Sequence, residues 1–187
     1  MTDADRERRR RLEALFRENV AGIASYCRWR SRSPGDVQDA VADVFLIAWR
    51  RLDDLPTGKD ARPWLYATAR RVLANQARAS ARRGKLNEKL SAQPIAVQTE
   101  EDPLHSRVHG ALAALGSGDR EVLLLAEWEG LTPAEIARVM RCPAVTVRGR
   151  LHRARRRFRA AFESQTVEEA NTTVRASVSP LLGRCEP

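Results

Sequence analysis

The segment from Thr132 to Phe162 constrains the fold more than any other part of the chain. Thr132-Pro133-Ala134-Glu135 is a capping-box sequence with proline at the first helical position, and it predicts a short helix ending at Met140. Arg141-Cys142-Pro143 predicts a tight turn, after which a longer helix follows over about residues 143–163. A short helix, a three-residue turn and a longer helix together predict a helix-turn-helix.

The two faces of the longer helix differ in character. Val147, Leu151 and Ala154 are spaced to pack against Ile136, Ala137 and Met140 of the short helix. Seven arginines and no acidic residue lie between Arg148 and Arg159, and phosphate groups would relieve their mutual repulsion. Such a face is also typical of a merely solvated surface. With the helix-turn-helix, however, it favours insertion into the major groove of duplex DNA. The residues predicted to contact duplex DNA are Thr146, Arg148, Gly149, Arg150, His152, Arg153 and Arg156.

The rest of the chain also shows helical spacing of apolar residues, which predicts an all-α fold. Helices are expected over about residues 10–30, 36–51, 60–83, 104–115 and 119–130, with Asp36 as an N-cap. Residues 84–103 have the composition of a flexible linker, and residues 164–187 that of a disordered tail. The sequence therefore predicts two small helical domains, residues 1–83 and 104–163, joined by a linker.

The charge balance favours a polyanionic partner. The chain has 33 Lys and Arg against 24 Asp and Glu, a net charge of +9, which favours nucleic acid first and an anionic membrane surface second. The surplus is divided between residues 1–83, with 18 basic and 11 acidic side chains, and residues 111–163, with 10 and 6. Two separate basic blocks suggest two binding modules.

Catalytic, metal and membrane sites are not predicted. The longest apolar run, Val44–Trp49, is too short to cross a bilayer. His105 and His109 are four residues apart but lack further ligands at a recognised spacing, so no metal or other cofactor is expected. The odd number and wide spacing of the cysteines favour a reducing cytoplasm over a disulfide framework. They are Cys27, Cys142 and Cys185.

Several motifs resemble those of bacterial sigma factors, above all the extracytoplasmic-function (ECF) class. Glu129–Ala137 and Thr146–Arg155, preceded by Arg120-Glu121-Val122, resemble the C-terminal promoter-binding region. Asp39–Trp49 resembles the polymerase-binding helix, and Ala61–Arg71 the promoter-melting helix. The resemblance covers about residues 12–163 and keeps the family's order of motifs.

The resemblance implies a sigma factor that binds core RNA polymerase and directs promoter-specific initiation without catalysis of its own. It implies contact with the clamp helices of the largest polymerase subunit, recognition of two promoter elements, DNA melting and regulation by an anti-sigma factor. The implied polymerase-binding residues are Asp36, Asp39, Asp43, Phe45, Leu46, Trp49 and Arg50. The residues implied to hold the melted element are Lys59, Arg62, Trp64, Arg70, Arg71 and Arg78.

Other interpretations stay open at this point. Asp36, Asp39 and Asp43 could serve only helix capping and solubility. Trp64 and Tyr66 could stack on bases, although the register of Trp64 favours the core. Ala42, Arg71, Asn75 and Pro143 depart from the family pattern and affect residue-level contacts more than the role. Two alternative functions are a stand-alone helix-turn-helix repressor or activator and a helical protein-protein adaptor.

Overall fold

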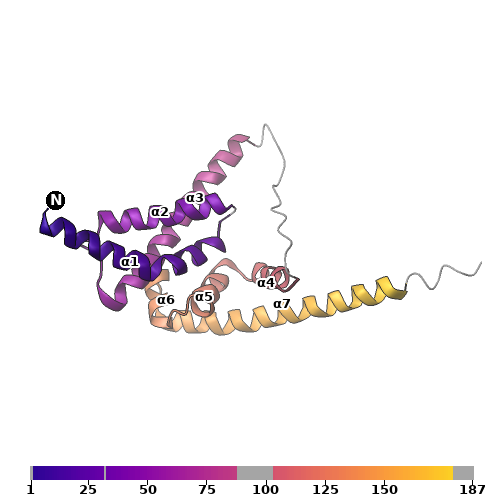
Figure 1. Ribbon diagram of the computed structural model, residues 1–187. Coiled ribbons are helices and arrows are strands. Elements are labelled where there is room, and N and C mark those ends of the chain that lie inside the picture. The colour runs from indigo at the N-terminus through magenta and orange to yellow at the C-terminus, as the bar shows by residue number, and fades with distance from the viewer. Residues whose placement is uncertain (1, 32, 88–102, 179–187) are drawn as a thin grey trace, which may run out of the picture. The chain divides into compact units, whose positions relative to one another are not determined.

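The computed structural model describes residues 2–31, 33–87 and 103–178 of the 187-residue chain (Figure 1). These ranges contain seven α-helices and one short 3-10 helix but no β-strand, which confirms the predicted all-α fold. None of the helices in these ranges is long and apolar enough to span a membrane. The chain forms two compact units: unit 1 is Met1–Ile95 with Leu124–Val147, and unit 2 is Ala96–Leu123 with Arg148–Pro187.

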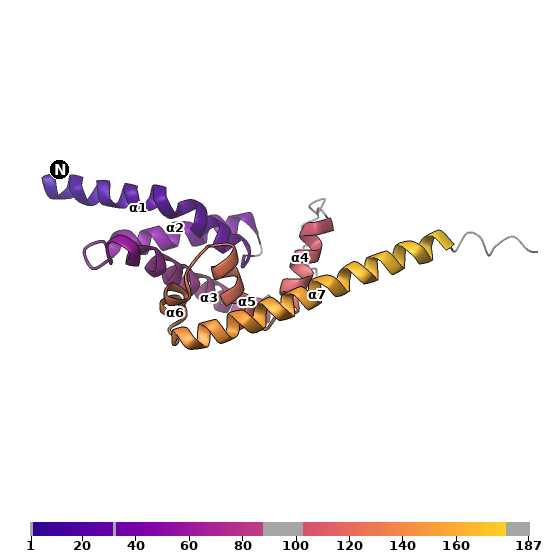
Figure 2. The same cartoon turned by 90° about the horizontal axis from the view of Figure 1, so that it is seen from below.

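Unit 1 is built on three long helices. They are α1 (Asp3–Arg28), α2 (Pro34–Arg50) and α3 (Ala61–Asn87), with the short helix η1 (Gly58–Asp60) before α3. The three pack against one another in both views (Figures 1 and 2). Their fully buried side chains include Ile23, Tyr26, Val44, Leu65 and Tyr66. The apolar stripes read from the sequence therefore form one core.

Local capping sets two of the helix starts. Helix α1 begins at Asp3, earlier than predicted, because Thr2 and Asp5 form a reciprocal capping box. The N-cap of α2 is Ser33, whose hydroxyl accepts a hydrogen bond from the Asp36 backbone N–H at 3.1 Å. The expectation that Asp36 caps this helix was wrong, because Pro34 occupies the first helical position and shifts the start by three residues.

Helix α6 (Pro133–Met140) also belongs to unit 1 and packs against α3. The predicted capping box is present: the Thr132 hydroxyl accepts from the Glu135 backbone at 3.3 Å, and the Glu135 carboxylate accepts from the Thr132 backbone at 2.8 Å. Ile136 and Val139 are buried, whereas Met140, expected in the core, is half-buried. The helix ends at Arg141, which has left-handed backbone angles (φ 52°, ψ 49°).

Unit 2 contains α4 (Pro103–Ala113), the beginning of α5 (Ser117–Glu127) and α7 (Ala144–Val178) from residue 148 onward. Buried side chains of the three helices, Leu112, Val122 and Leu151 among them, form its core together with Leu115 from the turn between α4 and α5. Helix α7 extends beyond the predicted end at residue 163, because neither proline nor glycine interrupts residues 150–179. Most of the predicted linker, residues 88–102, lies outside the described residues, as does the end of the tail.

Candidate nucleic-acid and polymerase interfaces

The arginine face of α7 is open to solvent along most of its length. Arg148, His152, Arg153 and Arg156 are exposed, while Val147, Leu151 and Ala154 are buried on the opposite face. Thr146, Gly149 and Arg150 are half-buried. The two faces thus divide as the periodicity predicts, and the side of α7 that could meet a phosphate backbone is uncovered within each unit.

Two arginines of α7 are partly engaged within unit 2. Arg157 donates to the Asp119 carboxylate at 3.0 Å. The guanidinium of Arg150 reaches Gly118, where a Cβ would lie 3.4 Å from its Nη1. A Cβ on Gly149 would meet only the end of the Arg153 side chain, at 3.6 Å, which is an ordinary van der Waals contact. The fold therefore does not require glycine at position 149.

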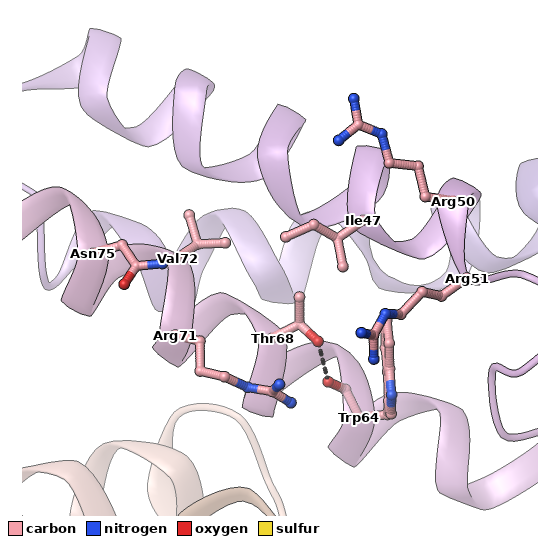
Figure 3. A pocket seen from close by; sticks show the side chains of 8 residues that line it. All are labelled: Ile47, Arg50, Arg51, Trp64, Thr68, Arg71, Val72 and Asn75. Carbon is pink, nitrogen blue, oxygen red and sulfur yellow. Dashed lines mark hydrogen bonds between the residues drawn. The ribbon is translucent and has the colours of Figure 1, made fainter.

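A pocket of about 370 Å³ lies between the C-terminal end of α2 and the middle of α3 (Figure 3). Three guanidinium groups, one indole ring and a few aliphatic side chains surround it. The Thr68 hydroxyl donates to the Trp64 carbonyl at 2.9 Å and so is held by its own helix. The lining residues are Ile47, Arg50, Arg51, Trp64, Thr68, Arg71, Val72 and Asn75. This combination suits a ligand that carries negative charge and a flat ring.

The structure brings together only part of the predicted melted-element set. Trp64 and Arg71 line the α2–α3 pocket, and Trp64 is half-buried rather than enclosed in the core. Lys59 and Arg62 line a second cavity, of about 520 Å³, between α1 and the start of α3. The exposed side chains of Arg70 and Arg78 line neither of these two cavities. Arg78 instead donates to Asn75 on the same helix.

Arg51 belongs to the α2–α3 pocket but was absent from the predicted set. It is the C-cap residue of α2, where the backbone leaves the helix. The Arg50-Arg51 pair at the end of an amphipathic helix was visible in the sequence, but its side-chain direction depends on the packing of α2 on α3. Asn75 lies one helical turn after Arg71 and is exposed.

The predicted polymerase-binding helix α2 presents a mixed surface. Asp36, Asp39, Asp43 and Arg50 are exposed. Leu46 and Trp49 are 46% and 39% exposed, which is unusual for large apolar side chains and is typical of a binding surface. The guanidinium of Arg8 lies 5.4 Å from the Trp49 ring centre.

Phe45 is the exception in that set, because it is buried. Its ring packs edge-on against Phe16 of α1, with 4.7 Å between ring centres. Phe16 itself is 45% exposed, although it shares the helical spacing of the apolar residues of α1. Helical periodicity identifies the apolar face but does not show where that face extends past the neighbouring helix.

A buried carboxylate follows α5. Glu129 is 6% exposed, and its Oε2 accepts a hydrogen bond from the hydroxyl of Tyr66, which is 1% exposed, at 2.7 Å. The guanidinium of Arg62 donates to the backbone carbonyl of Glu129 and lies 5.7 Å from the Tyr66 ring centre. Burial raises the pKa of the Glu129 carboxyl, while the hydrogen bond from Tyr66 opposes that shift. Burial and the neighbouring carboxylate raise the pKa of Tyr66.

The proposed stacking role of Tyr66 conflicts with this geometry, because the ring is enclosed. It contacts Tyr26 edge-on at 5.4 Å between ring centres, and its hydroxyl is bonded to Glu129. Among the described residues, no group of three or more potential metal ligands comes together.

Comparison with known proteins identifies the family. The Sigma-70 region 2 family model matches residues 15–83, and the Sigma-70 region 4 family model matches residues 105–158. The ECF RNA polymerase sigma-E factor of Escherichia coli strain K12 is 30% identical over 161 residues, which cover 77% of this chain and 81% of that protein. The chain belongs to the ECF sigma factors.

A second curated relative and two solved structures support the same family assignment or the same fold. The probable RNA polymerase sigma-C factor of Mycobacterium bovis is 31% identical over 151 residues, covering 78% of this chain and 80% of that protein. Two solved structures share the fold. One is the Bartonella quintana sigma factor RpoE in complex with the anti-sigma factor NepR, with a TM-score of 0.62, 22% identity, and coverage of 87% of this chain and 98% of that one. The other is CnrH in complex with the cytosolic domain of CnrY, with a TM-score of 0.61, 24% identity, and coverage of 82% and 88%.

Membership confirms the predicted family and its central function. This sigma factor directs transcription initiation by RNA polymerase, and its α2–α3 segment and helix-turn-helix lie in the family's region 2 and region 4 respectively. The stand-alone repressor and adaptor interpretations give no account of the region 2 match.

Proposed function

We propose that this sigma factor uses three separate surfaces during initiation. The exposed side of α2 binds core RNA polymerase, the α2–α3 pocket with the loop before α3 holds the melted promoter strand, and the arginine face of α7 reads an upstream duplex element. The observation that carries the proposal is the α2–α3 pocket, which Trp64 lines together with Arg50, Arg51 and Arg71, and in which Arg51 lies beside the Trp64 ring (Figure 3).

The chemistry of that pocket suits single-stranded DNA. A base has a flat apolar face that an indole ring can stack on, and each nucleotide carries a phosphate that guanidinium groups can bind. A duplex hides its bases, so the ligand is a strand whose base has left the stack. Lys59 and Arg62, at the second cavity, add positive charge beside the same helix.

On α2, the polymerase surface combines exposed acids with two exposed apolar side chains. Leu46 and Trp49 expose apolar surface whose burial against a partner would stabilise the complex. Asp39 and Asp43 carry negative charge that would orient a basic partner. This mixture fits a protein partner better than DNA, because phosphates repel the acids.

The arginine face of α7 reads duplex DNA. Arg148, His152 and Arg153 occupy its first exposed turns, the part of a recognition helix that reaches base edges. Arg156 lies further along the helix and serves the phosphate backbone.

Regulation involves an anti-sigma protein. One of the solved structures named above holds a sigma factor with the anti-sigma factor NepR, and the other holds CnrH with the cytosolic domain of CnrY. The exposed apolar side chains of α2 would gain from being covered whenever polymerase is absent. The sigma factor itself performs no covalent chemistry, which stays with the polymerase, and it acts in the cytoplasm.

In vitro transcription with purified core polymerase and genomic promoter fragments tests the proposal. The complete system should initiate at specific promoters, and Arg71→Ala should leave polymerase bound to the promoter while lowering permanganate reactivity of the melted bases about tenfold. Arg82→Ala, which removes an exposed arginine of α3 outside the pocket, should match the parent protein. A chain that fails to join core polymerase, or equal effects of the two substitutions, would contradict the assignment.

A further inference from the structure

Val145 is exposed at a position where nothing inside the protein explains a valine. It is the second residue of α7, and its side chain is 69% exposed, more than any other large apolar side chain in the ranges that the structure describes. Valine stabilises a helix less than alanine does, because its branched side chain loses rotamer freedom against the preceding turn. Neither burial nor helix propensity accounts for this residue, which leaves contact with a partner as its role.

The register of α7 places Val145 at the start of a row that faces away from the core. The members of this row are separated by four, three and four residues, a spacing that keeps them on one side of an α-helix. They are Val145, Gly149, His152 and Arg156. The buried positions of α7 begin at Val147, two residues after Val145, and so lie on the opposite side of the helix.

Gly149, one helical turn after Val145, also points to a partner that approaches this row. Inside the protein, a Cβ at this position would meet only Nη1 of Arg153, at 3.6 Å, so the fold does not require glycine there. Glycine in mid-helix weakens the helix but allows another molecule to approach the backbone closely. Val145 and Gly149 therefore form a low, uncharged step on the helix, with the exposed side chains of Arg148 and Arg153 on either side of it.

Duplex DNA fits this surface better than a protein partner does. Seven arginines and no acidic residue lie between Arg148 and Arg159, and phosphates on both sides of a groove can neutralise them. The valine side chain has no hydrogen-bonding group, so it cannot read the donors and acceptors of the base edges. The apolar group that the four bases display in the major groove is the C5 methyl group of thymine.

We propose that Val145 is a specificity-determining residue for the upstream promoter element, and that its γ-methyl groups pack against the C5 methyl group of one thymine in the major groove. This role rests on the proposed reading of duplex DNA by the arginine face of α7. Val145 and Arg148 are about 4.5 Å apart along the helix axis, and base pairs are about 3.4 Å apart, so the thymine lies within about two base pairs of the base that Arg148 contacts.

Replacing thymine by uracil removes this methyl group and leaves base pairing unchanged. The probe is a fluorescein-labelled duplex promoter fragment, taken from the genomic fragments that the holoenzyme transcribes, in which each thymine of the upstream element is replaced by uracil in turn. Holoenzyme affinity is measured at one salt concentration, because affinity for DNA depends steeply on salt. With the parent protein, uracil at one position should weaken binding about fourfold, the effect expected for one buried methyl group.

Two substitutions of Val145 and one control connect that position to this side chain. Val145→Ala shortens the side chain and favours the helix, so the ratio of thymine to uracil affinity should fall from about fourfold to below about twofold. Val145→Ile keeps the branched methyl groups and should keep the ratio. Leu104→Ala removes another exposed apolar side chain, on α4, and should match the parent protein at every position.

Three results would overturn the role of Val145. The first is that no uracil weakens binding of the parent holoenzyme, and the second is that the sensitive position stays equally sensitive in Val145→Ala. The third is that Val145→Ala weakens binding to thymine and uracil fragments alike, which would assign the side chain to a protein surface of the polymerase or to the spacing of phosphate contacts.

Arg148→Ala distinguishes these results from a failure of the proposed function. If Arg148→Ala weakens promoter binding while uracil has no effect, the arginine face still reads DNA and only the role of Val145 fails. If Arg148→Ala and Val145→Ala both leave promoter binding unchanged, α7 does not read the upstream element, and the proposed function of its arginine face fails as well.

Discussion

The strongest quantitative prediction concerns Arg120, which ties the end of α4 to the start of α5 in unit 2. Its Nε donates to the Leu112 carbonyl at 2.7 Å, and its Nη2 donates to the carbonyls of Ala113 and Leu115 at 2.9 and 3.1 Å. The last carbonyls of a helix lack the usual N–H partners of the next turn, and this guanidinium supplies charged donors to them. The Leu112 carbonyl also accepts from the Leu115 backbone N–H, at 3.2 Å. A positive charge at this end also suits the helix dipole.

Arg120→Ala should therefore destabilise this corner by about 2 kcal/mol. The hydrogen bonds from Arg120 to the Leu112 and Leu115 carbonyls are partly buried, and losing each of these charged donors costs about 1 kcal/mol. The bond to the Ala113 carbonyl is exposed and adds little. A loss of about 2 kcal/mol corresponds to about 30-fold faster local opening.

Hydrogen exchange followed by mass spectrometry on the full-length chain measures that opening. Peptides covering residues 104–116 should exchange about 30-fold faster in Arg120→Ala, while peptides of α2 should be unchanged. Arg120→Lys keeps the charge but loses the planar guanidinium with its several donors, so its exchange rate over residues 104–116 should lie between those of the parent and Arg120→Ala proteins. An acceleration of less than about threefold, or equal effects of alanine and lysine, would refute the assigned role of the guanidinium.

Three more outcomes are expected. Thr132→Ala should lower the free energy of unfolding by about 1 kcal/mol in guanidinium denaturation, because α6 loses its cap, and Thr132→Ser should restore most of it; no loss would contradict the capping role. Burial raises the pKa of the Cys27 thiol to about 11, so at neutral pH iodoacetamide should modify half-buried Cys142 well before Cys27, as peptide mass spectrometry would show; equal rates would contradict the burial of Cys27. Arg156→Ala should lower the slope of log affinity for promoter duplex against log salt by about 1 in holoenzyme, and an unchanged slope would remove Arg156 from the phosphate contacts.

Local signals explain most of what the sequence could predict. The capping box at Thr132, the turn at Pro143 and the arginine spacing of α7 each depend on residues within a few positions of one another. Such signals determine where a helix starts and which face is apolar. They also sufficed for the family resemblance, which the matches to regions 2 and 4 confirm.

What could not be predicted depends on packing between distant residues. Tyr66 and Glu129 are separated by 63 positions, and neither stands out from its neighbours in sequence. The exposure of Phe16 and the burial of Phe45 are decided by how far α1 and α2 overlap. The start of α2 was missed by three residues because Pro34 occupies the first helical position, which makes the preceding residue, Ser33, the N-cap in place of Asp36.

The turn between α6 and α7 depends on the backbone conformation of Arg141. Arg141 holds a left-handed conformation that costs an L-residue about 1–2 kcal/mol and costs glycine almost nothing. The neighbouring chain compensates, with the Cys142 N–H bonded to the Ala137 carbonyl at 3.1 Å and the Val147 N–H to the Pro143 carbonyl at 3.2 Å. The backbone hydrogen bonds on either side of Arg141, and not a conformational preference of arginine, therefore hold the chain in this bend. An engineer could place glycine there to relieve the strain, at the expense of one cation.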